Sequence, residues 1–233
     1  MGLMKSTSLI RRAVTVGAAT LVLASSTLGV TAYNYLKPTA AASAPIESVA
    51  LAAPETSGTV YELQNAQAQF IVDEVLRGSP FTVVGTTDEV AGQLALDLAD
   101  PSSVQLGTIL INARTLATDD SSRNRALGNQ ILNTAQYEYI SFTPTSISGL
   151  PEQLTVGQSY ALQLSGDLTI KDVTRPAVFN VNVTPTADGV LEGSATSTIQ
   201  YADWGVSIPS VPFVASVDNQ VTLQLDFTAT AEA

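Results

Sequence analysis

Two stretches of apolar–polar alternation, one on each side of a charged turn, constrain this chain more than any other feature. In LTIKDVTRPAVFNVNV, residues 168–183, Leu168 and Ile170 share one parity before the turn, and Phe179 and Val181 share one parity after it. A two-residue period is typical of β-strands whose two faces have different surroundings, so this stretch predicts two strands and a turn. The rest of the chain decides what the apolar face of this hairpin packs against.

The same period recurs from Val60 to the end of the chain. It is clearest in the run 221–228, where Val, Leu, Leu and Phe alternate with Thr, Gln, Asp and Thr. We count eight to ten strands joined by short turns, and Pro144 predicts an edge strand or a bulge in the run 142–147. Because parallel pairs need long crossovers and no regular helices separate the strands, we expect antiparallel order.

One helix is expected, over residues 122–132, with Ser121 or Ser122 as its cap and with Leu127 and Leu132 facing inward. An antiparallel set of this size must hide its edges, either by pairing two sheets or by closing into a barrel. Eight strands enclose a space that side chains can fill or that one small ligand can occupy. Periodicity alone does not choose between these alternatives.

The N-terminus predicts a membrane-spanning or signal helix. A basic lead, residues 1–12, precedes the segment 13–36, whose first twenty-one residues carry no charge and span roughly 31 Å as a helix. One alternative is an uncleaved signal-anchor, which gives a single-pass protein of the cytoplasmic membrane with its C-terminal domain outside. The other is a signal peptide cleaved near Ala44, which gives a secreted or periplasmic protein. A flexible linker rich in Ala, Pro and Ser (37–58) and the folded domain (59–233) follow.

Composition argues against several functions. The chain has no His and no Cys, which removes the commonest general base, the commonest metal ligand and all thiolate chemistry. Residues 50–233 carry six basic and twenty acidic groups, a formal charge of −14, so nucleic acid is not expected as a partner. Adjacent acids such as Asp73 and Glu74 point to opposite faces of a strand, which does not suit paired carboxylate catalysis. We therefore expect no enzyme, no catalytic residue, no metal site and no cofactor.

The motif GDLTIKDVTRPAVFNV, residues 166–181, resembles the signature of the YceI-like family. The segments 123–125 (RNR), 139–142 (YISF) and 203–206 (DWGV) resemble further family elements in the same order, and the resemblance covers about residues 60–231. Asn124 stands where an Asp is common, and Lys171-Asp172 replaces a glycine-containing turn.

This resemblance implies an all-β fold, namely an extended, eight-stranded, antiparallel, lipocalin-like barrel with one short helix. It also implies that an elongated cavity holds a long apolar chain, such as a polyisoprenoid, an isoprenoid quinone or another lipid, for carriage or sequestration outside the cytoplasm. The alternative is a non-enzymatic surface or interaction barrel with a filled core. The apolar lipid and the membrane are thus the expected partners.

The residues expected to line the cavity are apolar and share the inward parity of their strands. Arg123 and Arg125 are candidate contacts for a polar ligand end, although pairing with Asp119 and Asp120 is the alternative. Arg175 is expected to form an ion pair with Asp203, and Trp204 to plug one end of the barrel or to anchor the chain. The lining set is Phe70, Val72, Leu94, Leu96, Leu162, Leu164, Leu168, Phe179, Val181, Leu223, Leu225 and Phe227.

Overall fold

The computed structural model describes residues 37–42, 44–51, 58–210, 212 and 214–231. The chain divides into two compact units, Met1–Pro38 and Thr39–Ala233, and the second unit contains every described strand. The expected membrane or signal helix, residues 13–36, lies outside the described residues. Among the residues that are described, no helix is long and apolar enough to span a membrane.

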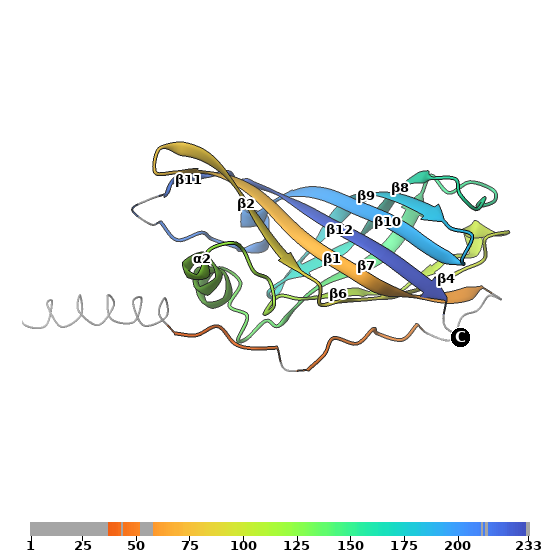
Figure 1. Ribbon diagram of the computed structural model, residues 1–233, viewed down its shortest axis with the longest axis horizontal. Helices are drawn as coiled ribbons and strands as arrows, with labels where there is room; N and C mark the ends of the chain where they lie inside the picture. Colours follow the sequence, from red (N-terminus) through yellow and green to blue (C-terminus); the bar gives the residue numbers. More distant parts are fainter. Residues whose placement is uncertain (1–36, 43, 52–57, 211, 213, 232–233) are drawn as a thin grey trace, which may run out of the picture. The chain divides into compact units, whose positions relative to one another are not determined.

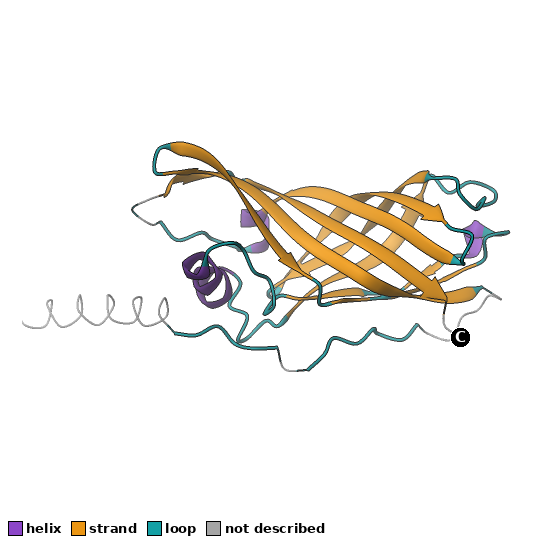
Figure 2. Ribbon diagram, viewed as in Figure 1, coloured by secondary structure: helices purple, strands orange, loops and turns teal. Residues whose placement is uncertain are grey.

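The domain is mostly β, and its strands form one strongly curled antiparallel sheet (Figures 1 and 2). The expected antiparallel order and the single short α-helix are confirmed for the described residues. The strands are β1 (Thr59–Leu76), β2 (Ser79–Thr87), β3 (Val90–Ala91), β4 (Gln93–Leu96), β5 (Gln105–Leu106), β6 (Ile109–Asn112), β7 (Tyr139–Ser148), β8 (Tyr160–Ile170), β9 (Val173–Pro185), β10 (Val190–Gln200), β11 (Val214–Val217) and β12 (Gln220–Ala231).

The hairpin predicted from residues 168–183 is present as β8 and β9. Its two strands pair over their length, and Ile170 pairs with Val173 across a two-residue turn. Lys171 adopts a φ of 60° in that turn, a left-handed conformation that glycine adopts more readily. The bulge expected at Pro144 is also present, because the register of β7 against β8 shifts between Pro144 and Ser146.

The pairing order is β3-β6-β7-β8-β9-β10-β12-β1-β4-β5, and β2 and β11 both pair with β1. Three consecutive strands, β2, β3 and β4, are separated only by residues 88–89 and Gly92. The first and last of these pair with β1, whereas β3 pairs with β6 on its other side. Figure 1 shows β1, β12, β10 and β9 side by side, which agrees with the ladders.

The expected helix begins one residue earlier than the sequence suggested. The α-helix α2 covers Ser121–Ala126 and continues as the π-helical turn η2, Leu127–Ile131. The prediction that a serine caps it is wrong. The carboxylate of Asp120 accepts hydrogen bonds from the main-chain N–H groups of Ser122 and Arg123 instead, at 2.8 Å each. A carboxylate satisfies these free donors more strongly than a hydroxyl because it is charged.

Two short 3-10 turns complete the domain, η1 (Pro101–Ser103) and η3 (Tyr201–Trp204). Trp204 at the end of η3 is 4% exposed and donates its indole N–H to the main-chain oxygen of Leu168 at 2.9 Å. The side chain therefore belongs to the core and ties η3 to β8, as an anchor residue does.

The described part of the linker is bound to the sheet at several points. The main-chain N–H of Ile46 donates to Glu89, and that of Leu51 donates to Gln93, both at 3.3 Å. Ser48 donates its hydroxyl hydrogen to Glu62 at 2.9 Å. These contacts place residues 46–51 beside the strands β1 and β4 and the turn before β3. The flexibility expected of residues 37–58 stays a prediction.

Candidate functional site

The concave face of the curled sheet is the candidate site because the apolar side chains converge on it. One cluster of buried side chains draws members from β1, β7, β8, β9, β10 and β12, together with Leu127, Leu132 and Trp204. Strands that lie far apart along a sheet can share a cluster only on the side toward which the sheet curls. That side is therefore apolar, and the opposite face carries Thr, Ser, Gln and Asn side chains.

The structure brings the predicted lining residues together on this face. Residues directly opposite each other on neighbouring strands point to the same side. Phe70 lies opposite Leu223, and Leu164 lies opposite Phe179. Eleven of the twelve belong to the apolar cluster or pack against it, and Leu162 is buried beside them. Six are buried (Leu96, Leu162, Leu164, Leu168, Phe179 and Leu225) and six are half-buried (Phe70, Val72, Leu94, Val181, Leu223 and Phe227).

The half-buried members are informative because they alternate with fully buried ones on the same face. On β12, Leu225 is 8% exposed and Ala229 is 0% exposed, whereas Leu223 and Phe227 on the same side are only half-buried. In an interior packed at normal protein density, side chains on the inward face of central strands lose almost all contact with solvent. The concave face therefore keeps accessible apolar surface between its buried residues.

Sequence reasoning missed several members of this face. Tyr61 and Leu63 on β1 are buried there, and Phe142 on β7 is 4% exposed. The Phe142 ring meets Phe179 edge-on, with 4.8 Å between ring centroids and 65° between planes. Phe142 begins the run 142–147, which the sequence already predicted as a strand. Tyr61 and Leu63 were hidden by a bulge in β1 that shifts the register between Gln64 and Gln67.

The two candidate arginines lie on α2, and the structure gives both of them partners within the chain. Arg123 contacts Glu74 of β1 at 3.0 Å and Asp119 at 2.6 Å, and its guanidinium lies 5.5 Å from the Phe81 ring centroid. The expected pairing with Asp119 is therefore present. Arg125 instead donates a hydrogen bond to the Ser122 hydroxyl at 3.0 Å. Their role as contacts for a polar ligand end stays a prediction.

Asp120 is close to both arginines but serves the helix. The hydrogen bond from the main-chain N–H of Arg123 lowers the pKa of Asp120, although partial burial acts in the opposite direction. The second main-chain donor, Ser122, and the positive charges of Arg123 and Arg125 lower that pKa further. The carboxylate is thus held in its charged form, as an N-terminal cap requires.

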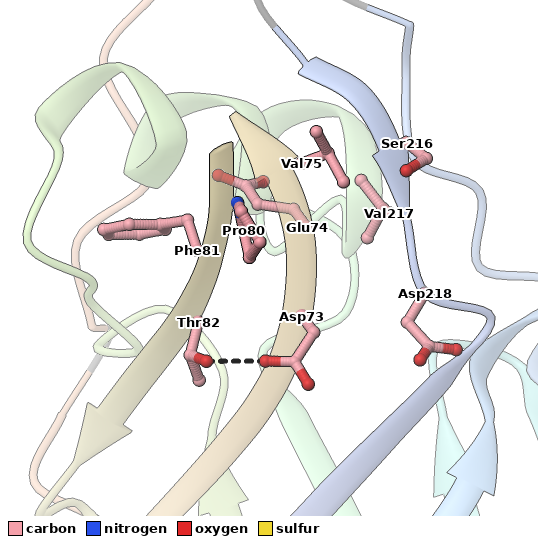
Figure 3. A pocket seen from close by; sticks show the side chains of 9 residues that line it. All are labelled: Asp73, Glu74, Val75, Pro80, Phe81, Thr82, Ser216, Val217 and Asp218. Atoms are coloured by element: carbon pink, nitrogen blue, oxygen red, sulfur yellow. Dashed lines mark hydrogen bonds between the residues drawn. The ribbon is translucent and has the colours of Figure 1, made fainter. Parts of the chain in front are cut away.

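A pocket of about 480 Å³ lies at the end of β1 next to these groups (Figure 3). Asp73 accepts a 2.6 Å hydrogen bond from Thr82, whereas the neighbouring Glu74 is buried and bound by Arg123. The two adjacent acids therefore point to opposite faces of β1, as expected. The lining residues are Asp73, Glu74, Val75, Pro80, Phe81, Thr82, Ser216, Val217 and Asp218. Among the described residues, no group of three acidic, His or Cys side chains is arranged to hold a metal ion.

Arg175 does reach Asp203, but not through an ion pair. Its Nε–H donates to the main-chain oxygen of Asp203 rather than to the carboxylate. The contact joins β9 to η3, so it supports the position of Trp204 next to it. The predicted pair of residues was right and the predicted kind of interaction was wrong.

These features define a class of protein, namely a curled antiparallel sheet with an apolar concave face and a short capped helix at one end. The model of the YceI-like domain family matches residues 61–229. The chain belongs to this family, as the motif at residues 166–181 predicted.

Individual relatives are distant. Protein YceI of Escherichia coli O157:H7 is 24% identical over 146 residues, which are 60% of this chain and 72% of that protein. A polyisoprenoid binding domain from Saccharophagus degradans, implicated in plant cell wall breakdown, superposes with a TM-score of 0.58 at 14% identity. That match covers 75% of this chain and 99% of the other. BcnA of Burkholderia cenocepacia matches with a TM-score of 0.55 at 15% identity, over 71% and 96% of the two chains. At such identities the structures share the fold alone.

Proposed function

We propose that this protein binds a long-chain apolar ligand on the concave face of its sheet, for carriage or sequestration near a membrane and without catalysis. The ligand is a polyisoprenoid, an isoprenoid quinone or another lipid. The observation that carries the proposal is the accessible apolar surface of the concave face, where Phe70, Leu223 and Phe227 are half-buried. The polyisoprenoid binding domain from Saccharophagus degradans, which has the same fold, supports the choice of ligand class.

The proposal includes the closure of the sheet into an eight-stranded, lipocalin-like barrel. If the broken runs β2–β3–β4, β5–β6 and β11–β12 each count as one strand, eight strands remain. The run β2–β3–β4 pairs with β1 through its ends and with β6 through Val90 and Ala91. The hydrogen bond from the Leu63 N–H to the Gly92 oxygen, at 2.9 Å, continues the pairing across the break. We call the space inside this barrel the channel.

Binding of such a ligand requires no catalytic group, because burial of its carbon chain supplies the affinity. Each methylene that leaves water contributes about 0.8 kcal/mol, so a chain of a few dozen carbons is held by a featureless apolar surface. The polar groups near one end, Arg123 and Arg125, are proposed to contact the polar end of the ligand. In this arrangement the apolar wall supplies affinity and the arginines supply orientation.

The location is also proposed. A helix over residues 13–36 would hold the domain at the outer face of the cytoplasmic membrane, or would direct its secretion if cleaved. The linker of residues 37–58 then keeps the domain within reach of the membrane, where long isoprenoid chains dissolve. Protease treatment of intact cells and of spheroplasts, whose outer layers are opened while the cytoplasmic membrane is intact, tests this. Protection of the domain in spheroplasts would contradict the proposed location.

The test of ligand binding is purification of the full chain from its own host, followed by native mass spectrometry and organic extraction. Two variants on β9 provide a matched comparison, because Val181 is half-buried on the concave face and Val178 is 48% exposed on the other. The wild type and Val178→Gln are expected to carry lipid, whereas Val181→Gln is expected to carry much less. A wild type without lipid, which also takes up no offered polyprenyl chain, would favour a surface or interaction barrel with a filled core.

A further inference from the structure

Three glycines lie within strands on the concave face, namely Gly85 of β2, Gly166 of β8 and Gly193 of β10. Glycine inside a strand weakens the strand. It is usually found where the backbone needs a positive φ or where another group approaches closely. None of the three has a positive φ, so unusual backbone geometry does not explain them. A close approach is the remaining reason.

Each of the three glycines is covered by a phenylalanine ring from the neighbouring strand. Phe70 of β1 lies directly opposite Gly85, and a Cβ atom at Gly85 would overlap the Phe70 ring. Phe227 of β12 lies directly opposite Gly193, where a Cβ atom would come within 2.5 Å of the ring.

The third pair is diagonal. Phe142 of β7 lies opposite Leu168, two residues from Gly166 along β8. A Cβ atom at Gly166 would lie 2.6 Å from the Phe142 ring. The three rings therefore lie over bare backbone, along the wall of the sheet, instead of projecting from it. A ring cannot take this position over any residue that has a side chain.

We propose that these glycine–phenylalanine pairs set the width of the channel, so that it admits a chain with methyl branches and not only an unbranched one. The inference rests on the proposed function. Two of the pairs lie at different positions along neighbouring strands, since Phe70 is opposite Leu223 and Phe227 is four residues farther along β12. At about 3.4 Å per residue, the two widened places are about 14 Å apart in the direction of the strands. Widening that repeats along the wall suits a ligand whose branches repeat along its chain.

Gly85 offers the cleanest test because the three atoms nearest to an added Cβ all belong to the Phe70 side chain. At Gly166 and Gly193 the added Cβ would also approach main-chain oxygens, of Thr143 and Asn182, and would disturb the sheet itself. Alanine at position 85 is compatible with the strand backbone, so Gly85→Ala is expected to displace the Phe70 ring toward the channel. The double variant Gly85→Ala/Phe70→Leu removes the displaced ring.

The experiment measures binding of phytanol and hexadecanol to the delipidated full chain. The two alcohols share one main chain and differ only by methyl branches. The wild type is expected to bind both. Gly85→Ala is expected to weaken phytanol binding by about tenfold and to change hexadecanol binding little, and Phe70→Leu in the same chain is expected to restore phytanol binding. Val84→Ile, which adds one carbon on an exposed neighbour in β2, is the control and is expected to bind as the wild type does.

The outcomes separate the two proposals. A wild type that binds neither alcohol contradicts the proposed function. A wild type that binds both, with a Gly85→Ala variant that loses both equally or neither, overturns the inference about width alone, as does a failure of Phe70→Leu to restore binding. If Gly85→Ala does not unfold cooperatively, Phe70→Trp asks the same question with Gly85 intact. The tryptophan ring is larger than the space over Gly85 that the Phe70 ring occupies. Selective loss of phytanol binding therefore supports the inference, and unchanged binding refutes it.

Discussion

The ion pair of Arg123 with Glu74 is buried, and its burial sets how much stability the protein should lose when Arg123 is replaced. The Glu74 side chain is 7% exposed, that of Arg123 is 22% exposed, and the two are 3.0 Å apart. Removing one partner of a buried pair costs about 3–5 kcal/mol, because the other charge stays buried without compensation. We expect Arg123→Met to lower the free energy of unfolding by about 3 kcal/mol, at the low end of that range since Arg123 is partly accessible.

The second partner of Arg123 provides the control. Asp119 is 68% exposed and lies four residues before Arg123 on the surface. Exposed pairs of this spacing contribute about 0.3–0.5 kcal/mol, so Asp119→Asn is expected to have that small effect. The double variant Glu74→Leu/Arg123→Met is expected to recover most of the stability lost in Arg123→Met, because both charges leave the protein interior together.

Urea unfolding measured by tryptophan fluorescence is a suitable assay, because Trp204 is the single tryptophan of the chain and is buried. For a domain of this size, 3 kcal/mol corresponds to a fall in Tm of about 6–12 °C. Equal effects of Arg123→Met and Asp119→Asn would refute the reasoning, as would a double variant that is less stable than Arg123→Met. Either result would mean that solvent screens Glu74 far more than its burial indicates.

Three other changes have defined outcomes. Trp204→Phe is expected to lower the free energy of unfolding by about 1–3 kcal/mol, since it removes the hydrogen bond from the buried indole N–H to the main-chain oxygen of Leu168 and shrinks a buried side chain; chemical denaturation followed by circular dichroism measures this, and an unchanged midpoint would contradict it. Lys171→Gly is expected to raise stability by about 0.5 kcal/mol, because relief of the left-handed conformation exceeds the added entropy of the unfolded chain; a lower Tm would refute that. Asp120→Ala is expected to cost about 1 kcal/mol at neutral pH. Because the pKa of Asp120 is lowered in the folded state, this difference should be complete above the unfolded pKa and should vanish as pH falls through the folded one; a constant difference across a titration of stability from neutral to acidic pH would argue against the cap.

The sequence predicted those parts of the fold in which neighbouring residues carry the whole signal. The β8–β9 hairpin followed from strict alternation around a short charged turn, and the bulge at Pro144 followed from the missing N–H of proline. The inward residues of β12, such as Leu223 and Phe227, were likewise identified by parity alone. In each case the deciding interaction lies within one strand or one turn.

The parts that were missed depend on residues far apart in the sequence. The bulge in β1 puts Asn65 at a φ of 45° and reverses the parity of the residues before it, which hid Tyr61 from a search for alternation. The burial of Glu74 depends on Arg123, forty-nine positions away. Gly85 gave a local signal, since glycine within a strand indicates close approach, but the approaching ring of Phe70 could not be named without the register of β1 against β2.

The ladder between β3 and β6 contains only two residue pairs, and so does the ladder between β4 and β5, whereas β8 and β9 share eleven. Thermal fluctuations that separate neighbouring strands will therefore begin where β3 and β4 meet β6 and β5, and the amide hydrogens there will exchange with solvent before those of β8. The main-chain hydrogen bonds of Ile46 and Leu51 attach the linker just before and just after β3. Detachment of that linker would thus loosen the sheet in a region where neighbouring strands share the fewest residue pairs.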